Sequence, residues 1–353
     1  MESCLNSLYK DKNVKDLHCK RFQRSIIILN AKSSFYSRMN RSRSSCWGSI
    51  KSRGSELGGK KILVLGGEGM LGHKMFQTLR SRYPVTICTI ARSLAEPFYR
   101  KIPLYCTGNV VDQVDAMDFG TIHRTLGKHR PDWIINCIGV IKQREEAKAA
   151  IPSITLNSLL PHKLAEFARE WGGRVIHFST DCVFSGRQGN YTEESPSDAE
   201  DLYGKSKFLG EVTTGNALTL RTSIIGRELA HFRSLLEWFL SQNGKAVRGF
   251  RRVIYSGVTT NYLAQLVGDL ITDHPSLSGL YQVTSPPVSK YELLSMIRES
   301  FGLKIEIVSD DREVSDRSMI GEKFRKATGY PWPEWPALLK QLADDPTPYG
   351  DWR

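Results

Sequence analysis

The sequence predicts an α/β protein: a doubly wound parallel sheet with a smaller α/β lobe in its C-terminal part. Two observations carry this prediction. From residue 60 onward, short apolar runs of strand type alternate with amphipathic segments of helical type, which is typical of a parallel sheet with helices on both faces. In addition, a glycine-rich turn joins the first apolar run to the first helical segment, as in sheets that bind nucleotides.

The first apolar run covers residues 62–65 and is continuous, as expected for a central parallel strand buried on both faces. Three evenly spaced glycines follow it: Gly66, Gly69 and Gly72. In a Rossmann-type turn, such glycines permit a tight exit from the strand, close approach to a pyrophosphate and close packing of the helix. We therefore predict a dinucleotide site at Gly66, Gly69, Met70, Leu71 and Gly72. The alternative is a purely structural glycine turn.

The second apolar run, residues 85–90, bears on which dinucleotide is bound. Enzymes that prefer NAD usually place a carboxylate after this strand to accept from the ribose 2′-hydroxyl. This chain offers Arg92 and Ser93 there, with Glu96 further along. Because a guanidinium group suits a 2′-phosphate, the sequence favours NADP(H). NAD(H) is the alternative cofactor, and a solvated loop position is the alternative for Arg92.

Further strand-like runs follow at residues 133–138, 174–178, 218–225 and 279–283, with an amphipathic helix at 156–167. Ligands of such a sheet bind beyond the carboxyl ends of its strands. Ser179, Thr180 and Asp181 stand just beyond the run 174–178. Tyr203 and Lys207 are four residues apart in a helical segment, which places both on one face.

These residue types suit the reduction of a ketone, because hydride delivery leaves an alkoxide that must take up a proton. The hydroxyl of Tyr203 can supply that proton, and the ammonium group of Lys207 is expected to lower the pKa of the tyrosine. Thr180 would hydrogen-bond the substrate oxygen and orient it. The alternative is an exposed Tyr203 and Lys207 pair on a helix, with Thr180 as a turn residue.

The glycine turn, Ser179-Thr180-Asp181 and Tyr203-x-x-x-Lys207 together resemble the extended short-chain dehydrogenase/reductase family. Within it, three stretches are similar to the dTDP-4-dehydrorhamnose reductase family: S-T-D-C-V-F-S-G, D-L-Y-G-K-S-K-F-L-G-E and L-R-T-S-I-I-G. The resemblance covers roughly residues 60–340. Two positions depart from it: Cys182 stands where the family usually carries an aromatic residue, and Asp316-Arg317-Ser318 only partly matches an Arg-Pro-containing substrate segment.

The resemblance implies roles for these residues. Thr180, Tyr203 and Lys207 would be catalytic, with Lys207 also reaching the nicotinamide ribose. Further contacts to the cofactor would come from Asn136, Cys137, Gly139 and Asn157. Contacts to the sugar would come from Asp181, Cys182, Thr222 and Ser223.

The chain is expected to divide into a basic, disordered extension (1–58), an NAD(P)-binding Rossmann domain (59–225) and a mainly substrate-binding lobe (226–353). A strand near 279–285 would return from the lobe to the Rossmann sheet. In the lobe we expect helices at 232–240 and 291–301 and a strand at 305–308. Arg252 and Arg317 are candidate partners of a diphosphate, with solvated surface charge as the alternative.

The net charge of +12 belongs mostly to the extension, because residues 1–60 hold thirteen Lys and Arg against four Asp and Glu. Nucleic-acid binding and organelle targeting are alternatives for that segment alone, and no nucleic-acid partner is expected for the main body. No apolar run has the length of a membrane span. The seven cysteines form no C-x-x-C pair, so neither a disulfide framework nor a metal site is predicted, and a cytoplasmic location fits best.

The function that these observations favour is NAD(P)H-dependent reduction of a keto group on a nucleotide-activated deoxysugar, as in surface-polysaccharide or deoxysugar biosynthesis. A sugar epimerase or 4,6-dehydratase of the same fold is one alternative. A non-catalytic subunit that binds a dinucleotide is another, although intact Thr180, Tyr203 and Lys207 argue against a pure binding module. A homodimer is left open.

Overall fold

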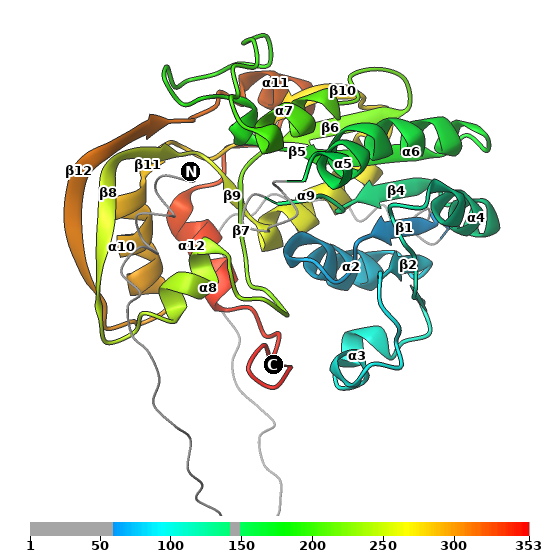
Figure 1. Ribbon diagram of the computed structural model, residues 1–353, viewed down its shortest axis with the longest axis horizontal. Helices are drawn as coiled ribbons and strands as arrows, with labels where there is room; N and C mark the ends of the chain where they lie inside the picture. Colours follow the sequence, from blue (N-terminus) through cyan, green and yellow to red (C-terminus); the bar gives the residue numbers. More distant parts are fainter. Residues whose placement is uncertain (1–58, 142–148, 353) are drawn as a thin grey trace, which may run out of the picture. The chain divides into compact units, whose positions relative to one another are not determined.

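The computed structural model describes residues 59–141 and 149–352, shown in colour in Figure 1. The predicted extension, residues 1–58, lies outside the described residues. The described chain folds around a seven-stranded sheet, accompanied by a three-stranded and a two-stranded sheet. Among its described residues, no helix is long and apolar enough to cross a membrane.

The large sheet has the strand order β10-β6-β5-β4-β1-β2-β3, and every adjacent pair is parallel. The sheet changes winding direction at β1, which is hydrogen-bonded to both β2 and β4, so ligands are expected above that point. The predicted doubly wound, Rossmann-type sheet is confirmed. Its strands are β1 (Ile62–Leu65), β2 (Thr86–Thr89), β3 (Val110–Val111), β4 (Trp133–Asn136), β5 (Arg174–Ser179), β6 (Ala217–Arg221) and β10 (Gly279–Gln282).

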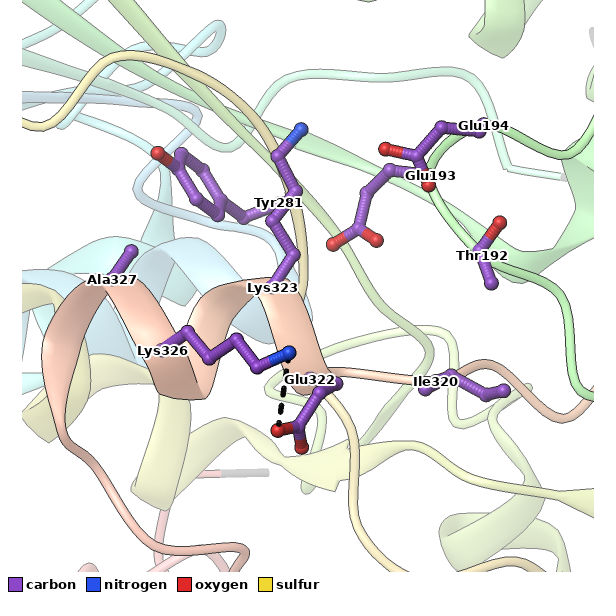
Figure 2. Close-up of a pocket in the computed structure, with 9 residues that line it drawn as sticks. All are labelled: Thr192, Glu193, Glu194, Tyr281, Ile320, Glu322, Lys323, Lys326 and Ala327. Atoms are coloured by element: carbon purple, nitrogen blue, oxygen red, sulfur yellow. Dashed lines mark ion pairs between the residues drawn. The ribbon is translucent and has the colours of Figure 1, made fainter.

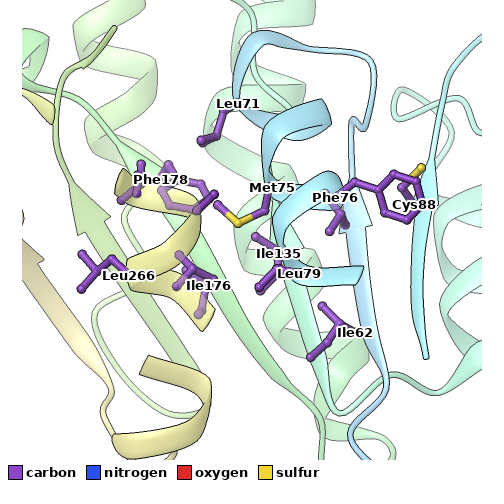
Figure 3. Packing of buried hydrophobic residues seen from close by; sticks show 14 of the residues in the cluster. Ile62, Leu71, Met75, Phe76, Leu79, Cys88, Ile135, Ile176, Phe178 and Leu266 are labelled. Atoms are coloured by element: carbon purple, nitrogen blue, oxygen red, sulfur yellow. The ribbon is translucent and has the colours of Figure 1, made fainter. Parts of the chain in front are cut away.

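Helices cover both faces of this sheet because its strands are apolar on both faces. Ile62 of β1 packs with α2 and α9 on one face, where Met75, Leu79 and Leu266 are buried (Figure 3). Leu63, the next residue, belongs to the core on the opposite face, under α4 and α6. The helices around the sheet are α2 (Met70–Arg82), α3 (Pro97–Arg100), α4 (Phe119–His129), α5 (Ala150–Ser153), α6 (Leu160–Arg169), α7 (Leu202–Leu209), α9 (Thr260–Asp273) and α11 (Glu322–Thr328).

The smaller lobe is built on the three-stranded sheet β11-β8-β12, against which α10 packs (Figure 1). Its elements are α8 (Leu235–Leu240), β8 (Ala246–Tyr255), β11 (Val288–Ser289), α10 (Lys290–Ser300), β12 (Glu306–Asp316) and α12 (Trp335–Ala343). The strand expected at 218–225 is two strands: after β6, the chain enters β7 (Ile224–Ile225), which pairs with β9 (Val258–Thr259) in the two-stranded sheet. The pairing of β12 with β8 extends it well beyond the expected 305–308.

Parts of the C-terminal half lie with the large sheet. Besides β10, helix α9 packs on α2, and the last described residues also return there. The ammonium group of Lys74 pairs with Asp345 at 2.5 Å, and the hydroxyl of Tyr349 lies 3.0 Å from Nε2 of His73. We keep the division near residue 225 as a proposal, with α9, β10 and this C-terminal segment assigned to the Rossmann side.

Candidate active site

The glycine-rich turn has the close backbone packing that a dinucleotide site needs. Gly66 has φ +74°, in the left-handed region that favours glycine. A Cβ atom at Gly72 would lie 1.9 Å from the carbonyl oxygen of Gly66, so no larger residue fits there. Gly67 was not among the predicted site residues, yet a Cβ there would lie 2.9 Å from Sγ of Cys88. The turn can therefore cradle a pyrophosphate beside the N-terminus of α2.

The end of β2 carries the residues expected to select the cofactor. The side chain of Arg92 is 64% exposed, and its guanidinium group is 3.7 Å from the carboxylate of Glu96. A second carboxylate, that of Glu68, accepts from the hydroxyl of Tyr99 at 2.5 Å. Glu68, Arg92 and Glu96 are all close enough to act on the pKa of this tyrosine. Sequence reasoning missed Glu68, which stands inside the glycine turn.

The loop after β4 brings predicted cofactor residues together. Asn157 lies in a π-helical turn (Ile154–Leu159) and bonds the backbone of Val140 twice: it accepts from the amide at 2.9 Å and donates to the carbonyl at 3.1 Å. It also donates to Ser206 of α7 at 3.2 Å. A Cβ at Gly139 would lie 3.1 Å from Oδ1 of Asn157 and 4.0 Å from Nζ of Lys207. The missing side chain leaves this spot open beside Lys207.

Two other predicted cofactor residues at this strand end have structural contacts. The amide of Asn136 donates to Nδ1 of His177 at 3.1 Å, and its carbonyl accepts from the backbone of Ile138. Burial raises the pKa of the Cys137 thiol, which keeps it protonated. Both residues line the loop, and their contact with a cofactor stays a proposal.

Thr180 begins a short 3₁₀ turn (Asp181–Val183) directly after β5. Its hydroxyl accepts from the backbone of Cys182 at 3.1 Å and donates to the carboxylate of Asp181 at 3.1 Å. The same hydroxyl lies close enough to the side chain of Tyr203 to lower the pKa of that tyrosine. Thr180 and Tyr203, separated by more than twenty residues in sequence, are thus brought together.

Helix α7 presents Tyr203 and Lys207 to this turn. The carboxylate of Asp201 caps the helix by accepting from the backbone of Gly204 at 2.7 Å. Lys207 is buried, and its ammonium group donates to the carbonyl oxygen of Phe178 at 2.6 Å. Burial lowers the pKa of Lys207 to about 8, although the nearby Glu211 raises it.

The expected lowering of the pKa of Tyr203 is not what the structure shows. Burial, together with Cys182, Asp181 and Asp201, raises that pKa well above its usual value near 10. The nearby hydroxyl of Thr180 acts in the opposite direction and lowers the pKa. Tyr203 therefore stays protonated at neutral pH, which is the state a proton donor needs.

A buried ion pair supports the site from beneath. The guanidinium group of Arg221, at the end of β6, donates to both carboxylate oxygens of Glu211, at 2.9 and 2.7 Å. Glu211 also accepts from the hydroxyl of Ser179 at 2.6 Å. The sequence predicts no role for Glu211, whereas the resemblance places Arg221, with Thr222 and Ser223, along the cofactor and the sugar. Nothing in the local sequence indicates that Arg221 and Glu211 pair across ten residues.

The remaining predicted substrate residues differ in their surroundings. Thr222 is buried and Ser223 is half-buried after β6. Arg317 donates to the carbonyl oxygen of Phe184 at 2.8 Å, which places it beside the catalytic turn. Arg252 lies exposed on β8 of the lobe, and its contact with a diphosphate stays a proposal.

A separate pocket of about 620 Å³ lies between β10, α11 and the segment before α7 (Figure 2). Its lining mixes the carboxylates of Glu193, Glu194 and Glu322 with the ammonium groups of Lys323 and Lys326. Lys326 is 3.9 Å from Glu322. None of the predicted catalytic residues lines this pocket. The candidate active site is therefore the one described above, at the carboxyl ends of the strands of the large sheet.

Residues 60–345 match the family model of the RmlD substrate binding domain. The chain belongs to this family. The match spans both the Rossmann part and the lobe, so the RmlD family assignment covers every predicted site residue.

Three proteins illustrate the similarity of this RmlD family chain to known ones. The spore coat polysaccharide biosynthesis protein SpsK of Bacillus subtilis is 27% identical over 257 residues, covering 70% of this chain and 82% of that protein. The methionine adenosyltransferase 2 subunit beta of Rattus norvegicus is 25% identical over 292 residues, covering 76% and 79%. The structure of the dTDP-4-dehydrorhamnose reductase of Bacillus anthracis with NADP gives a TM-score of 0.64 at 19% identity, covering 80% of this chain and 98% of that one.

Proposed function

We propose that this protein reduces a keto group on a nucleotide-activated deoxysugar, with NADPH as the preferred reductant and NADH as the alternative. The observation that carries the proposal is the assembly of Thr180, Tyr203 and Lys207 at the carboxyl edge of the sheet. That assembly lies beside a glycine turn shaped for a pyrophosphate. The names of two similar proteins agree with it: one takes part in polysaccharide biosynthesis, and the other is a sugar-nucleotide reductase solved with NADP.

The residues present fit a dinucleotide. Gly66 and Gly72 leave no room for larger side chains, which lets the backbone approach a pyrophosphate. Arg92 is exposed and faces a carboxylate that only loosely pairs with it, so it can turn to a 2′-phosphate. Gly139 leaves space next to Lys207 and Asn157, where the nicotinamide ribose would lie. The bound cofactor would supply the hydride.

The chain's own residues then handle the oxygen and its proton. The hydroxyl of Thr180 would hydrogen-bond the keto oxygen and fix its orientation. Tyr203, held protonated by its surroundings, would donate its proton to that oxygen as the carbonyl becomes an alcohol. Lys207 would then stabilise the phenolate with its positive charge until a proton is taken up from solvent.

The reductase is favoured over a 4,6-dehydratase because of the 181–182 turn. A dehydratase must also remove a proton beside the keto group and expel a hydroxyl, which needs a second acid/base pair. The dehydratases that this chain resembles carry Asp-Glu after the threonine, where this chain has Asp181 and Cys182. Cys182 is buried, and a buried thiol does not ionise as a carboxylate does at neutral pH.

The proposal is tested by following NADPH oxidation with a panel of nucleotide-linked 4-keto-6-deoxy sugars. We expect one NADPH to be consumed for each alcohol formed. Replacing Tyr203 by Phe should lower turnover by roughly 10²–10⁴ while NADPH still binds, because that range is what general acid catalysis supplies.

Two other results would each contradict the proposal in favour of a different function. Turnover of a 4-hydroxy sugar nucleotide without net NADPH oxidation would indicate an epimerase or dehydratase. NADPH binding without reduction of any keto sugar would favour a regulatory subunit, in line with the name of the rat relative.

We also propose that the protein forms a homodimer through the face that contains α7. Five large apolar side chains are exposed on three adjacent elements: Ile151, Ile154, Leu159, Phe208 and Leu209. Exposed apolar patches of this kind mark interaction sites more often than ordinary surface. Sedimentation equilibrium of the wild type and of Leu209→Glu would test it, with the variant expected to be monomeric.

A further inference from the structure

A second tyrosine, Tyr255, lies at the site although no sequence motif indicated it. It is the last residue of β8, in the lobe, and its side chain is 4% exposed. The ring packs near that of Trp335, with centroids 5.6 Å apart, and the ammonium group of Lys290 lies 3.9 Å from its centroid. These contacts hold the ring in place, so the hydroxyl is the part of the side chain that is available to bind a ligand.

The hydroxyl of Tyr255 points from the lobe to the carboxyl edge of the large sheet. A Cβ atom at Gly257 would lie 2.3 Å from that hydroxyl and 2.3 Å from the carbonyl oxygen of Ser223. The hydroxyl of Tyr255 and the carbonyl oxygen of Ser223 thus both border Gly257, where a residue with a Cβ atom would not fit. Asp181 and Cys182 are also close enough to raise the pKa of Tyr255, as they do for Tyr203. The two tyrosines, from α7 and β8, therefore converge on one turn.

Among the described residues, the hydroxyl of Tyr255 has no partner with good hydrogen-bond geometry. The side chain of Ser223 lies close enough to lower the pKa of Tyr255, but it does not meet the hydroxyl of Tyr255 with hydrogen-bond geometry. Tyr83 shows the usual arrangement for a buried phenol, since its hydroxyl donates to the carbonyl of Gly268 at 2.8 Å and contacts Thr272 at 2.6 Å. A buried polar group without a partner costs free energy, and phenylalanine would pack as well without that cost.

We infer that Tyr255 is a substrate-positioning residue whose hydroxyl bonds a hydroxyl group of the sugar, next to the carbon that is reduced. The inference rests on the proposed function. A phenol both donates and accepts, which matches a sugar hydroxyl. The buried carboxylate of Asp181 beside it disfavours the other candidate, a diphosphate oxygen, by charge repulsion. Tyr203 and Tyr255 would then hold neighbouring oxygens of one sugar ring.

The test compares Tyr255→Phe with Tyr83→Phe, which removes the hydroxyl of a partnered buried tyrosine far from the site. For Tyr255→Phe we expect an unchanged or higher melting temperature, an unchanged Kd for NADPH and a KM for the keto sugar nucleotide raised about tenfold. For Tyr83→Phe we expect a lower melting temperature and an unchanged KM. A lower melting temperature with an unchanged KM in Tyr255→Phe would show a structural role and overturn the inference.

A second measurement separates this inference from the proposed function. If the wild type reduces no keto sugar nucleotide, the proposed function fails, and binding of dTDP-glucose to the NADPH-saturated protein is measured by calorimetry instead. We expect Tyr255→Phe to bind dTDP-glucose about tenfold more weakly than the wild type. Equal affinities, or no binding to either protein, would overturn the inference.

Discussion

The carbonyl oxygen of Cys182 lies so close to Gly204 that a Cβ atom at that glycine would come within 2.2 Å of it. This contact joins the catalytic turn after β5 to the first turn of α7. Because backbone cannot yield as a side-chain end can, Gly204→Ala should push the helix outward and separate Tyr203 from Thr180. We expect a loss of turnover of at least tenfold together with a loss of stability on the order of 1–3 kcal/mol, the usual cost of overpacking.

The matched control is Gly127→Ala, in the last turn of α4, where a Cβ would meet nothing within 4 Å. Replacing a helical glycine in open space should stabilise the protein by about 0.4–1 kcal/mol and leave turnover unchanged. Turnover of Gly204→Ala close to that of the wild type, measured with the same substrate, would show that the helix and the turn need not touch.

Local sequence patterns were enough to predict six of the seven strands of the large sheet; the short edge strand β3 was not predicted. The runs that became β1, β4 and β5 are mostly apolar and almost wholly buried, and such runs predict a strand from local sequence alone. Thr180 could be singled out because it directly follows the strand run of β5, and Tyr203 and Lys207 because they stand four residues apart on one helix.

What the sequence could not reveal depends on contacts between distant segments. Tyr255 ends a strand whose partners, β11 and β12, lie far along the chain, and no spacing signals that its hydroxyl meets the turn at Asp181. The return of the C-terminal segment to α2 is equally non-local, since Lys74 and Asp345 are separated by most of the domain. The strand expected at 218–225 was divided because pairing with β9 competes for its second half.

The low pKa of Lys207 predicts how turnover depends on pH. Burial lowers this pKa to about 8, so the ammonium group that stabilises the Tyr203 phenolate is lost as the pH rises beyond that value. We expect kcat to fall above about pH 8, in a profile measured with saturating NADPH and substrate. In Lys207→Met, which has no ammonium group, kcat should be low and should lack this step.

The same shift makes a prediction about stability. In the unfolded chain the pKa of Lys207 is near its ordinary value of 10.5, whereas in the folded chain this pKa is about 8. Between these values the unfolded chain binds more protons, so folding becomes more favourable as the pH rises. The stability of the wild type relative to Lys207→Met should therefore increase from pH 8 to 10. Lys205→Met, at an exposed position of the same helix, keeps Lys207 and should give the same two pH profiles as the wild type. Loss of either pH dependence in that variant would contradict the assignment to Lys207.

Cofactor choice is predicted to depend partly on Arg92. Its guanidinium group is largely exposed and 3.7 Å from Glu96, so it can exchange this loose pair for the 2′-phosphate of NADPH. Arg92→Ala should weaken NADPH binding by about tenfold, the size of one charge-assisted contact, and leave NADH binding unchanged. Fluorescence titration of both cofactors measures this.

Arg124→Ala is the control for Arg92→Ala, because it removes the same charge from an exposed position on α4. It should affect neither cofactor. Equal weakening of NADPH and NADH by Arg92→Ala would show that the residue does not recognise the 2′-phosphate.

The buried pair of Arg221 and Glu211 gives the last prediction. Both side chains are nearly inaccessible, at 2% and 3% exposed, so removing either partner leaves a charge without compensation in the interior. We expect Glu211→Leu and Arg221→Met each to lower the free energy of unfolding by about 3–5 kcal/mol. The double variant should lose much less than the sum, because no charge then remains buried. Urea unfolding of the four proteins gives the coupling free energy.

The exposed pair of Lys340 and Asp344 is the control, since its removal should cost no more than about 1 kcal/mol. Additive losses in the Arg221 and Glu211 variants would mean that each side chain stabilises the fold independently. Turnover of the double variant adds a further test, because Glu211 also accepts from Ser179, the residue before Thr180. If the pair positions the catalytic turn, the double variant should be more stable than either single variant, but its turnover should stay below that of the wild type. Recovery of both would limit the role of the pair to folding.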